Sequence, residues 1–235
     1  MRKHLVFLLL IVLPLLAQQA QAPVEITAEP HHHLVVDNKV VRAFAFSVNP
    51  GDATLMHKHG HDYISVFIGD SQATNTKEGA APAPVAFKDG DVRFAPAGLV
   101  HAVADTGSTP VRNATIELLG TTTNAKACSE SCAVAIPCDS ADKSKCTSAN
   151  KAFASDQWTV TMVTIPAGGK YPEHTHAGPF LNVALADADV TIKPQKGAET
   201  KLHSKAGDII WNEPTTHAVT NTGSTAAKVA VIDFK

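Results

Sequence analysis

Hydrophobic and polar positions alternate along most of the chain in short runs, and the clearest run begins at Lys39. One face of this run carries Val40, Arg42, Phe44, Phe46 and Val48. Successive side chains of a strand point to opposite faces, so a period of two predicts a strand. The sequence Asn49-Pro50-Gly51-Asp52 follows as a turn, because proline, glycine and asparagine favour turn conformations.

Other runs predict strands at residues 63–68, 85–87, 92–95, 101–104 and 111–119. A second series is expected at residues 157–165, 180–185, 189–193, 208–211, 217–220 and 227–234. No long stretch repeats its apolar residues with the period of 3.6 that is typical of a helix. Short strands separated by turns at close intervals indicate an all-β protein, either a sandwich or a barrel.

The two series of strands are copies of one pattern. At one constant offset, Gly51 aligns with Gly168, His57 with His174 and His59 with His176, and a single-residue deletion then aligns His101 with His217. A repeat this regular predicts two domains with the same fold.

The repeated histidines are the strongest chemical feature of the sequence. His57 and His59 are two residues apart, so on a strand both imidazoles point to one face. Imidazole is a common ligand of zinc, copper, iron and nickel, and two on one face form a chelating pair. The triplet His31-His32-His33 also invites a metal-binding interpretation. It lies near a flexible terminus, however, and we interpret it as a solvated stretch.

A polar segment, residues 120–156, separates the two series and contains all four cysteines: Cys128, Cys132, Cys138 and Cys146. So long a connector is unusual unless something ties it. An even number of cysteines in an exported chain predicts two disulfides, for which three pairings are possible. A four-thiolate zinc site is the alternative, although its usual C-x-x-C pairs are absent.

The N-terminus has the layout of a secretory signal peptide over residues 1–22. A positive stretch, Met1 to His4, precedes the apolar run Leu5 to Leu16, and small and polar residues follow. The apolar run is interrupted by Pro14 and is too short to span a bilayer. We therefore expect a periplasmic or secreted protein with no membrane attachment after cleavage.

Composition and charge exclude some classes of partner. The chain has 235 residues, of which 44% are hydrophobic and 18% charged, and this is typical of a folded globular protein. The formal net charge of −2 offers no basic face, so nucleic acid is not an expected partner. A small-molecule ligand or substrate is expected instead, and exposed strand edges make a homodimer possible.

The spacing of these residues resembles the two motifs of the cupin superfamily. Gly51, five residues and His57-Lys58-His59 match the first motif, and Gly90, Pro96-Ala97-Gly98 and His101 match the second, with Asp105 in its asparagine position. The second copy has Glu213-Pro214-Thr215 in place of P-x-G. It keeps the other main positions of both motifs: Gly168, His174, His176, Gly207, His217 and Asn221. The chain resembles an exported bacterial two-domain cupin, or bicupin.

This resemblance implies two tandem cupin barrels (double-stranded β-helices, or jelly rolls) joined by a cysteine-rich linker. It places the first domain at residues 23–119, the linker at 120–156 and the second domain at 157–235. It also implies a divalent transition metal in each competent barrel, with Fe, Mn, Zn, Ni and Cu all compatible with the ligands. The expected ligands are His57, His59, His101, His174, His176 and His217.

The sequence departs from the family pattern at the fourth ligand, which is usually a glutamate. Tyr63 and Phe180 stand at that position in the two copies. Asp62 lies one residue earlier, and His61 would share the ligand face on a continuing strand, so either could complete the first site. This resembles the three-histidine cupins, which include thiol and diketone dioxygenases. Tyr63, if it points inward, is a predicted proton or hydrogen-bond donor to a bound ligand.

The leading hypothesis is therefore a metal-dependent cupin that acts on a small organic molecule, in the manner of a dioxygenase. The alternative is a non-catalytic bicupin that binds or stores a small ligand. A third hypothesis is isomerase or sugar-modifying chemistry without a metal, which some cupins perform. The fold alone does not decide among them.

Overall fold

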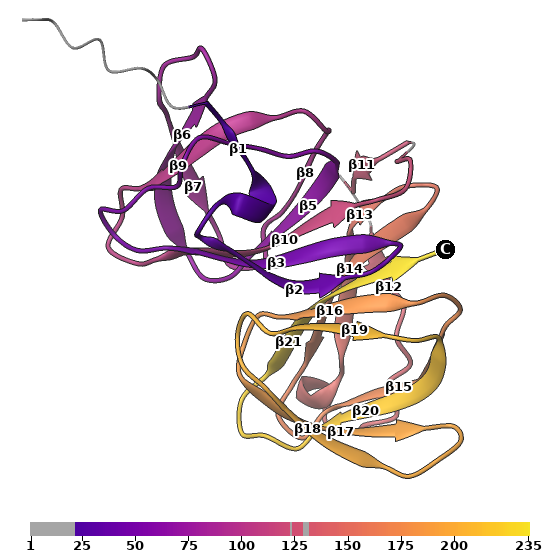
Figure 1. Ribbon diagram of the computed structural model, residues 1–235. Helices are drawn as coiled ribbons and strands as arrows, with labels where there is room; N and C mark the ends of the chain where they lie inside the picture. Colours follow the sequence, from indigo (N-terminus) through magenta and orange to yellow (C-terminus); the bar gives the residue numbers. More distant parts are fainter. Residues whose placement is uncertain (1–21, 123, 129–131) are drawn as a thin grey trace, which may run out of the picture.

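A computed structural model describes residues 22–122, 124–128 and 132–235. The signal peptide expected over residues 1–22 lies outside this described part, except for its last residue. No helix within the described residues is both long enough and apolar enough to span a membrane. Figure 1 shows two β-barrels, the N-terminal one above the C-terminal one. The all-β fold class predicted from the alternating pattern is confirmed.

The first barrel consists of two five-stranded sheets. The strand order in one is β1-β4-β9-β6-β7, and in the other it is β2-β3-β10-β5-β8. The elements are β1 (Val24–Glu25), the 3-10 helix η1 (Ile26–Ala28), β2 (His32–Asp37), β3 (Val41–Val48), β4 (His57–Lys58), β5 (Asp62–Phe67), β6 (Ser71–Lys77), β7 (Ala83–Phe87), β8 (Val92–Ala95), β9 (Val100–Asp105) and β10 (Val111–Leu118).

The second barrel repeats this plan. Its sheets run β11-β13-β14-β21-β16-β19, with β12 paired to β13, and β15-β20-β17-β18. The elements are β11 (Lys126–Ala127), β12 (Ala133–Val134), the 3-10 helix η2 (Lys143–Lys145), β13 (Ser148–Ala154), β14 (Trp158–Ile165), β15 (Lys170–His176), β16 (Phe180–Ala184), β17 (Ala188–Pro194), β18 (Thr200–Ser204), β19 (Ile209–Asn212), β20 (Thr215–Asn221) and β21 (Ala227–Phe234).

The two barrels pack against each other through the outer faces of two sheets, the β2-β3-β10-β5-β8 sheet of the first barrel and the sheet of the second barrel that contains β14, β21 and β16. One core cluster contains Val41 and Ile116 of the first barrel together with Trp158 and Leu181 of the second. The Phe94 ring lies 5.9 Å from that of Trp158. The two faces of β3 are therefore both largely buried, one against the second barrel and one inside the first, which explains why both faces of this run are rich in apolar residues.

Two segments are more ordered than the sequence suggested. The expected connector contains η2 and ends in β13, which pairs antiparallel with β14 and so belongs to the second barrel. Similarly, β2 pairs with β3 in the first barrel. Ser148–Ala154 carries few β-branched residues, and its strand conformation comes from pairing with a neighbour rather than from local propensity. The disulfides join Cys128 to Cys132 and Cys138 to Cys146.

Candidate metal centres

Strands β4 and β9 bring the first three histidines together. His57 and His101 are directly paired across these strands. His59 is held by its backbone, since its N–H donates to the Leu99 carbonyl over 3.0 Å and its own carbonyl accepts from Gly98 over 2.8 Å. One ring nitrogen from each histidine lies within 4.8 Å of the others. Strands β4 and β9, together with the turn at Gly98, thus point the three imidazoles toward one another.

The separations within this group suit a shared ion. Nε2 of His59 lies 3.1 Å from Nε2 of His101. Two nitrogen ligands bound at about 2.1 Å to one ion, about 90–109° apart, would be about 3.0–3.4 Å from each other. Nε2 of His57 is buried and has no hydrogen-bond partner in the described structure. A buried nitrogen without a partner is costly unless something binds it.

Neighbouring groups orient two of the three rings. Nδ1 of His57 donates to the Leu55 carbonyl over 2.9 Å, and Nδ1 of His101 lies 2.9 Å from Oδ1 of Asn75. These bonds leave each Nε2 lone pair free for an ion. Burial also disfavours the charged rings and lowers the pKa of His57 to about 4, of His59 to about 2 and of His101 to about 3. The neutral imidazole is the form that binds metals.

The second barrel repeats the histidine triad, but here a carboxylate also orients one of the three rings. Nε2 of His174 lies 3.1 Å from Nε2 of His217, and Nδ1 of His174 bonds the Pro172 carbonyl over 2.9 Å. Nδ1 of His176 hydrogen-bonds to the carboxylate of Asp233. Ring nitrogens of these three histidines also lie within 4.8 Å of one another. Both predicted histidine triads are therefore brought together as possible metal sites.

The structure does not bring the other two proposed ligands, His61 and Asp62, to the triad. Strand β4 ends at Lys58 and β5 begins at Asp62, so the chain between them is not a continuing strand. Oδ1 of Asp62 accepts a hydrogen bond from the backbone N–H of Ala97 over 2.8 Å. Side chains alternate along β5, so Asp62 faces away from the side that Tyr63 occupies.

Tyr63 lines the cavity beside the triad. Its ring stacks on that of His59 with centroids 3.8 Å apart and an interplanar angle of 14°. Burial raises the pKa of its hydroxyl, so Tyr63 stays protonated at neutral pH. Phe180 stacks on His176 with the same separation and angle. The role of Tyr63 as a proton or hydrogen-bond donor stays a prediction. That role requires the side chain to point into the barrel, and Tyr63 does line the cavity.

His32 is a site residue that the sequence pattern does not reveal, and Glu29 holds it by a hydrogen bond. The sequence predicts a solvated histidine triplet, but His32 is 8% exposed and its ring centroid lies 4.8 Å from that of His57. Burial lowers the pKa of His32, and the hydrogen bond from Nδ1 to Glu29 only partly opposes this effect. The sequence offered one clue, a glutamate three residues earlier, but it could not show which histidine of the triplet points inward.

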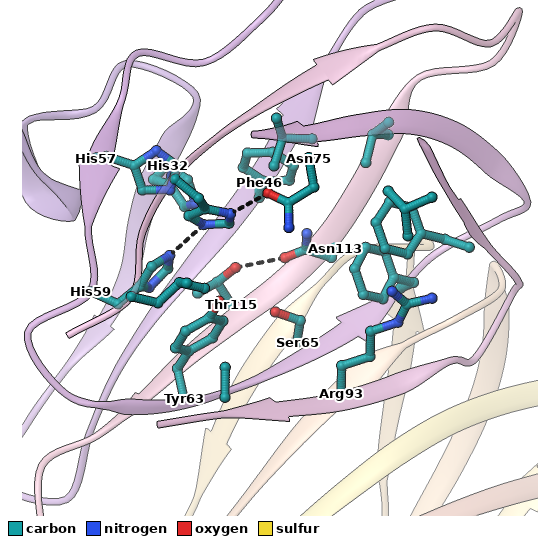
Figure 2. A pocket seen from close by; sticks show the side chains of 18 of the residues that line it. His32, Phe46, His57, His59, Tyr63, Ser65, Asn75, Arg93, Asn113 and Thr115 are labelled. Atoms are coloured by element: carbon teal, nitrogen blue, oxygen red, sulfur yellow. Dashed lines mark hydrogen bonds between the residues drawn. The ribbon is translucent and has the colours of Figure 1, made fainter. Parts of the chain in front are cut away.

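Figure 2 shows His32, His57, His59 and Tyr63 around the first cavity, whose volume is about 200 Å³. The cavity is also lined by five other polar side chains: Ser65, Asn75, Arg93, Asn113 and Thr115. The Arg93 guanidinium lies 4.5 Å from the centre of the Phe87 ring and donates to the Ala86 carbonyl over 2.9 Å. Hydrogen-bonding groups therefore lie along the cavity as well as at its histidine end.

No family model matches the chain, and no curated protein matches it. Solved structures do. AerE from Microcystis aeruginosa is 14% identical over 88% of this chain and 98% of its own, with a TM-score of 0.57. A structure of oxalate decarboxylase is 14% identical over 84% of this chain and 69% of its own, with a TM-score of 0.58.

Another structure concerns the Mn(II) centres of Bacillus subtilis oxalate decarboxylase, and it is 13% identical over 89% of this chain and 76% of its own, with a TM-score of 0.58. At these identities the likeness shows the fold alone. Together with the two histidine triads, it shows a cupin-like fold, as the motif resemblance implied.

Proposed function

We propose that the first barrel binds a divalent transition metal through His57, His59 and His101 and acts on a small polar organic molecule. The observation that carries this proposal is the convergence of three buried imidazoles at one end of a cavity that is lined by both polar and apolar side chains. A ligand could lie in this cavity and reach the ion and the polar groups together.

The residues fit a bound ion on the evidence of their own geometry. One ion would account for the 3.1 Å separation between Nε2 of His59 and Nε2 of His101. It would also bind Nε2 of His57, which is buried and has no hydrogen-bond partner among the described residues. A bound ion with three protein ligands keeps open coordination positions, where it would supply Lewis-acid or redox chemistry. Mn(II) and Fe(II) are the first ions to test, since manganese centres occur in one of the structurally similar proteins.

The protein's own groups would bind and orient the substrate. Tyr63 is protonated and can donate a hydrogen bond to a polar atom beside the triad. Thr115, which donates to Oδ1 of Asn113 over 2.7 Å, leaves the amide NH₂ of Asn113 as a donor. Within this function we propose a dioxygenase-like reaction, which the three-histidine ligand set supports by resemblance.

The test combines metal analysis with oxygen uptake. Purified protein, reconstituted with Mn(II) or Fe(II), is compared with the variants His57→Ala and His101→Gln and with His33→Ala, whose side chain is exposed. We expect metal at the first site in the wild type and in the His33 variant, and its loss in the other two. Equal occupancy in all four proteins would contradict the proposal. Oxygen uptake with thiols, diketones and phenols then tests the dioxygenase-like reaction.

A second function, non-catalytic binding of a small ligand, is favoured by one observation. Among the described residues, no carboxylate joins either histidine group as a possible ligand. If the metal-loaded protein binds members of the substrate panel but turns none of them over, this alternative replaces the enzymatic one.

We also propose that the protein is exported to the periplasm or secreted, and that it acts without nucleic acid or membrane partners. The two disulfides support export, because they persist in oxidising compartments. Cell fractionation, with the mature N-terminus identified by mass spectrometry, tests this proposal. A cytoplasmic protein that retains residues 1–22 would contradict it. The homodimer stays a prediction, which light scattering on purified protein would check.

A further inference from the structure

The strand registers allow the two barrel cavities to be compared position by position. In the first barrel, Ser65 pairs with both Arg93 and Thr115. In the second barrel, Asn182 pairs with both Ile210 and Val231. Ile210 therefore takes the place of Arg93, and Val231 takes the place of Thr115. Arg93 and Thr115 line the first cavity, and Ile210 and Val231 line the second.

Two further polar positions change in the same direction. Asn113 pairs with Phe67 in the first barrel, whereas Val229 pairs with Ala184 in the second. Asn75 pairs with Val103 in the first barrel, whereas Ile192 pairs with Val219 in the second, so Ile192 takes the place of Asn75. Four polar cavity side chains of the first barrel are thus branched aliphatic residues in the second.

The second cavity is also larger. Val163, Ala184 and Ser204 stand where the first barrel has three phenylalanines, Phe46, Phe67 and Phe87. The volume is about 340 Å³, compared with about 200 Å³ in the first barrel. The larger value lies within the range of small-molecule sites, and most such sites are lined by apolar side chains.

One polar group in the second cavity has no partner. Asn182 lines the cavity, and its Oδ1 is buried and accepts no hydrogen bond within the described residues. Burying an acceptor without a donor is unfavourable. A ligand that carries an N–H or O–H group would satisfy this atom.

We propose that the second barrel binds an apolar, aromatic small molecule that carries one hydrogen-bond donor, such as a hydroxyl or an arylamine. Its rings lie against Ile192, Ile210, Val229 and Val231, and its donor faces Asn182. This inference goes beyond the function proposed for the first barrel, which handles a polar molecule in a smaller cavity. It requires no metal at either site.

The test is a titration with N-phenyl-1-naphthylamine, which carries one N–H group and fluoresces more strongly in apolar surroundings. We expect the purified full-length protein to bind one equivalent. Ala184→Phe, which introduces the residue of the first barrel, fills the cavity and should weaken binding at least tenfold. Val231→Thr keeps the shape of the side chain but replaces one methyl group by a hydroxyl, and it should weaken binding several-fold.

The matched control is Thr115→Val, the reciprocal change in the first barrel, which should leave the affinity unchanged. Circular dichroism of each variant reports whether it is folded, and Val231→Thr decides the matter if Ala184→Phe does not fold. Absence of binding to the wild type would overturn the inference. It would equally be overturned if folded Val231→Thr bound the probe as tightly as the wild type, or if Thr115→Val weakened binding to the same extent.

Discussion

Glu29 and His32 form a buried hydrogen bond of 2.7 Å between Oε2 and Nδ1 beside the first histidine triad. The same carboxylate accepts hydrogen bonds from the backbone N–H groups of His31 and Leu55. Burial raises the pKa of Glu29, but the hydrogen bonds from His32 and His31 outweigh it and lower the pKa from 4.5 to about 2. An ionised carboxylate thus ties the start of β2 to the loop that leads into β4.

This pair predicts a specific dependence of stability on pH. A carboxyl group whose pKa is lowered by folding stabilises the protein above its unfolded pKa, and the contribution is lost as pH falls through the folded pKa. The contribution of Glu29 should therefore be complete above pH 4.5 and decline toward pH 2. It should amount to about 3 kcal/mol. In urea unfolding, Glu29→Gln should be less stable than the wild type at pH 7, with the difference shrinking below pH 4.5. A difference independent of pH would contradict this account.

His32 should affect ligand binding more than metal binding. The His32 ring lies against His57 but is not part of the histidine triad. Ala149 is the equivalent residue of the second barrel, because Ala149 pairs with Val163 as His32 pairs with Phe46. His32→Ala should retain the metal content of the first barrel, measured by mass spectrometry, and should weaken binding of a polar ligand about tenfold. His33→Ala is the control. Loss of the metal in His32→Ala would instead assign His32 to the ion.

Asp233 should affect metal binding in the second barrel only. Its carboxylate orients His176, and replacing such a partner typically reduces metal affinity about 10–100-fold. Asp233→Asn should therefore weaken retention of the second ion against a chelator, with no change in the first. The equivalent residue of the first barrel, Glu117, pairs with Tyr63 as Asp233 pairs with Phe180. Its carboxylate lies 3.6 Å from the Arg42 guanidinium, however, and it hydrogen-bonds to none of the three histidines in the described structure. Glu117→Gln is thus the matched control and should leave both ions in place.

Trp158 should be important for the stability of both barrels together. It is 2% exposed, and its ring contacts Phe94 of the first barrel and Phe153 of the second. Trp158→Ala should reduce the free energy of unfolding by about 3–5 kcal/mol, as is usual for loss of a buried aromatic side chain. Because the core is shared, the two barrels should unfold in one thermal transition. Leu34→Ala is an exposed control and should change stability by less than about 0.5 kcal/mol.

Much of the fold could be predicted because local pattern carries it. The alternation from Val40 to Val48 predicts a strand, and the repeated spacing of the histidines predicts two copies of one barrel. The strand Ser148–Ala154 could not be predicted, because its conformation depends on pairing with β14, a contact that its own residues do not encode. The same is true of the disulfide pairing, since any two of the four cysteines could be joined until the chain between them is placed.

The sequence by itself determined the fold class, the duplication and the identity of the two histidine triads, because each follows from residue type and spacing along one chain. Only the tertiary structure decided that Asp62 turns to the backbone of Ala97 and that His32 enters the first barrel. It also decided that the two cavities differ in size and that polar side chains of the first cavity correspond to aliphatic ones in the second. These features depend on which segments meet across the barrels, and hydrogen bonding and burial act between residues that are far apart in sequence.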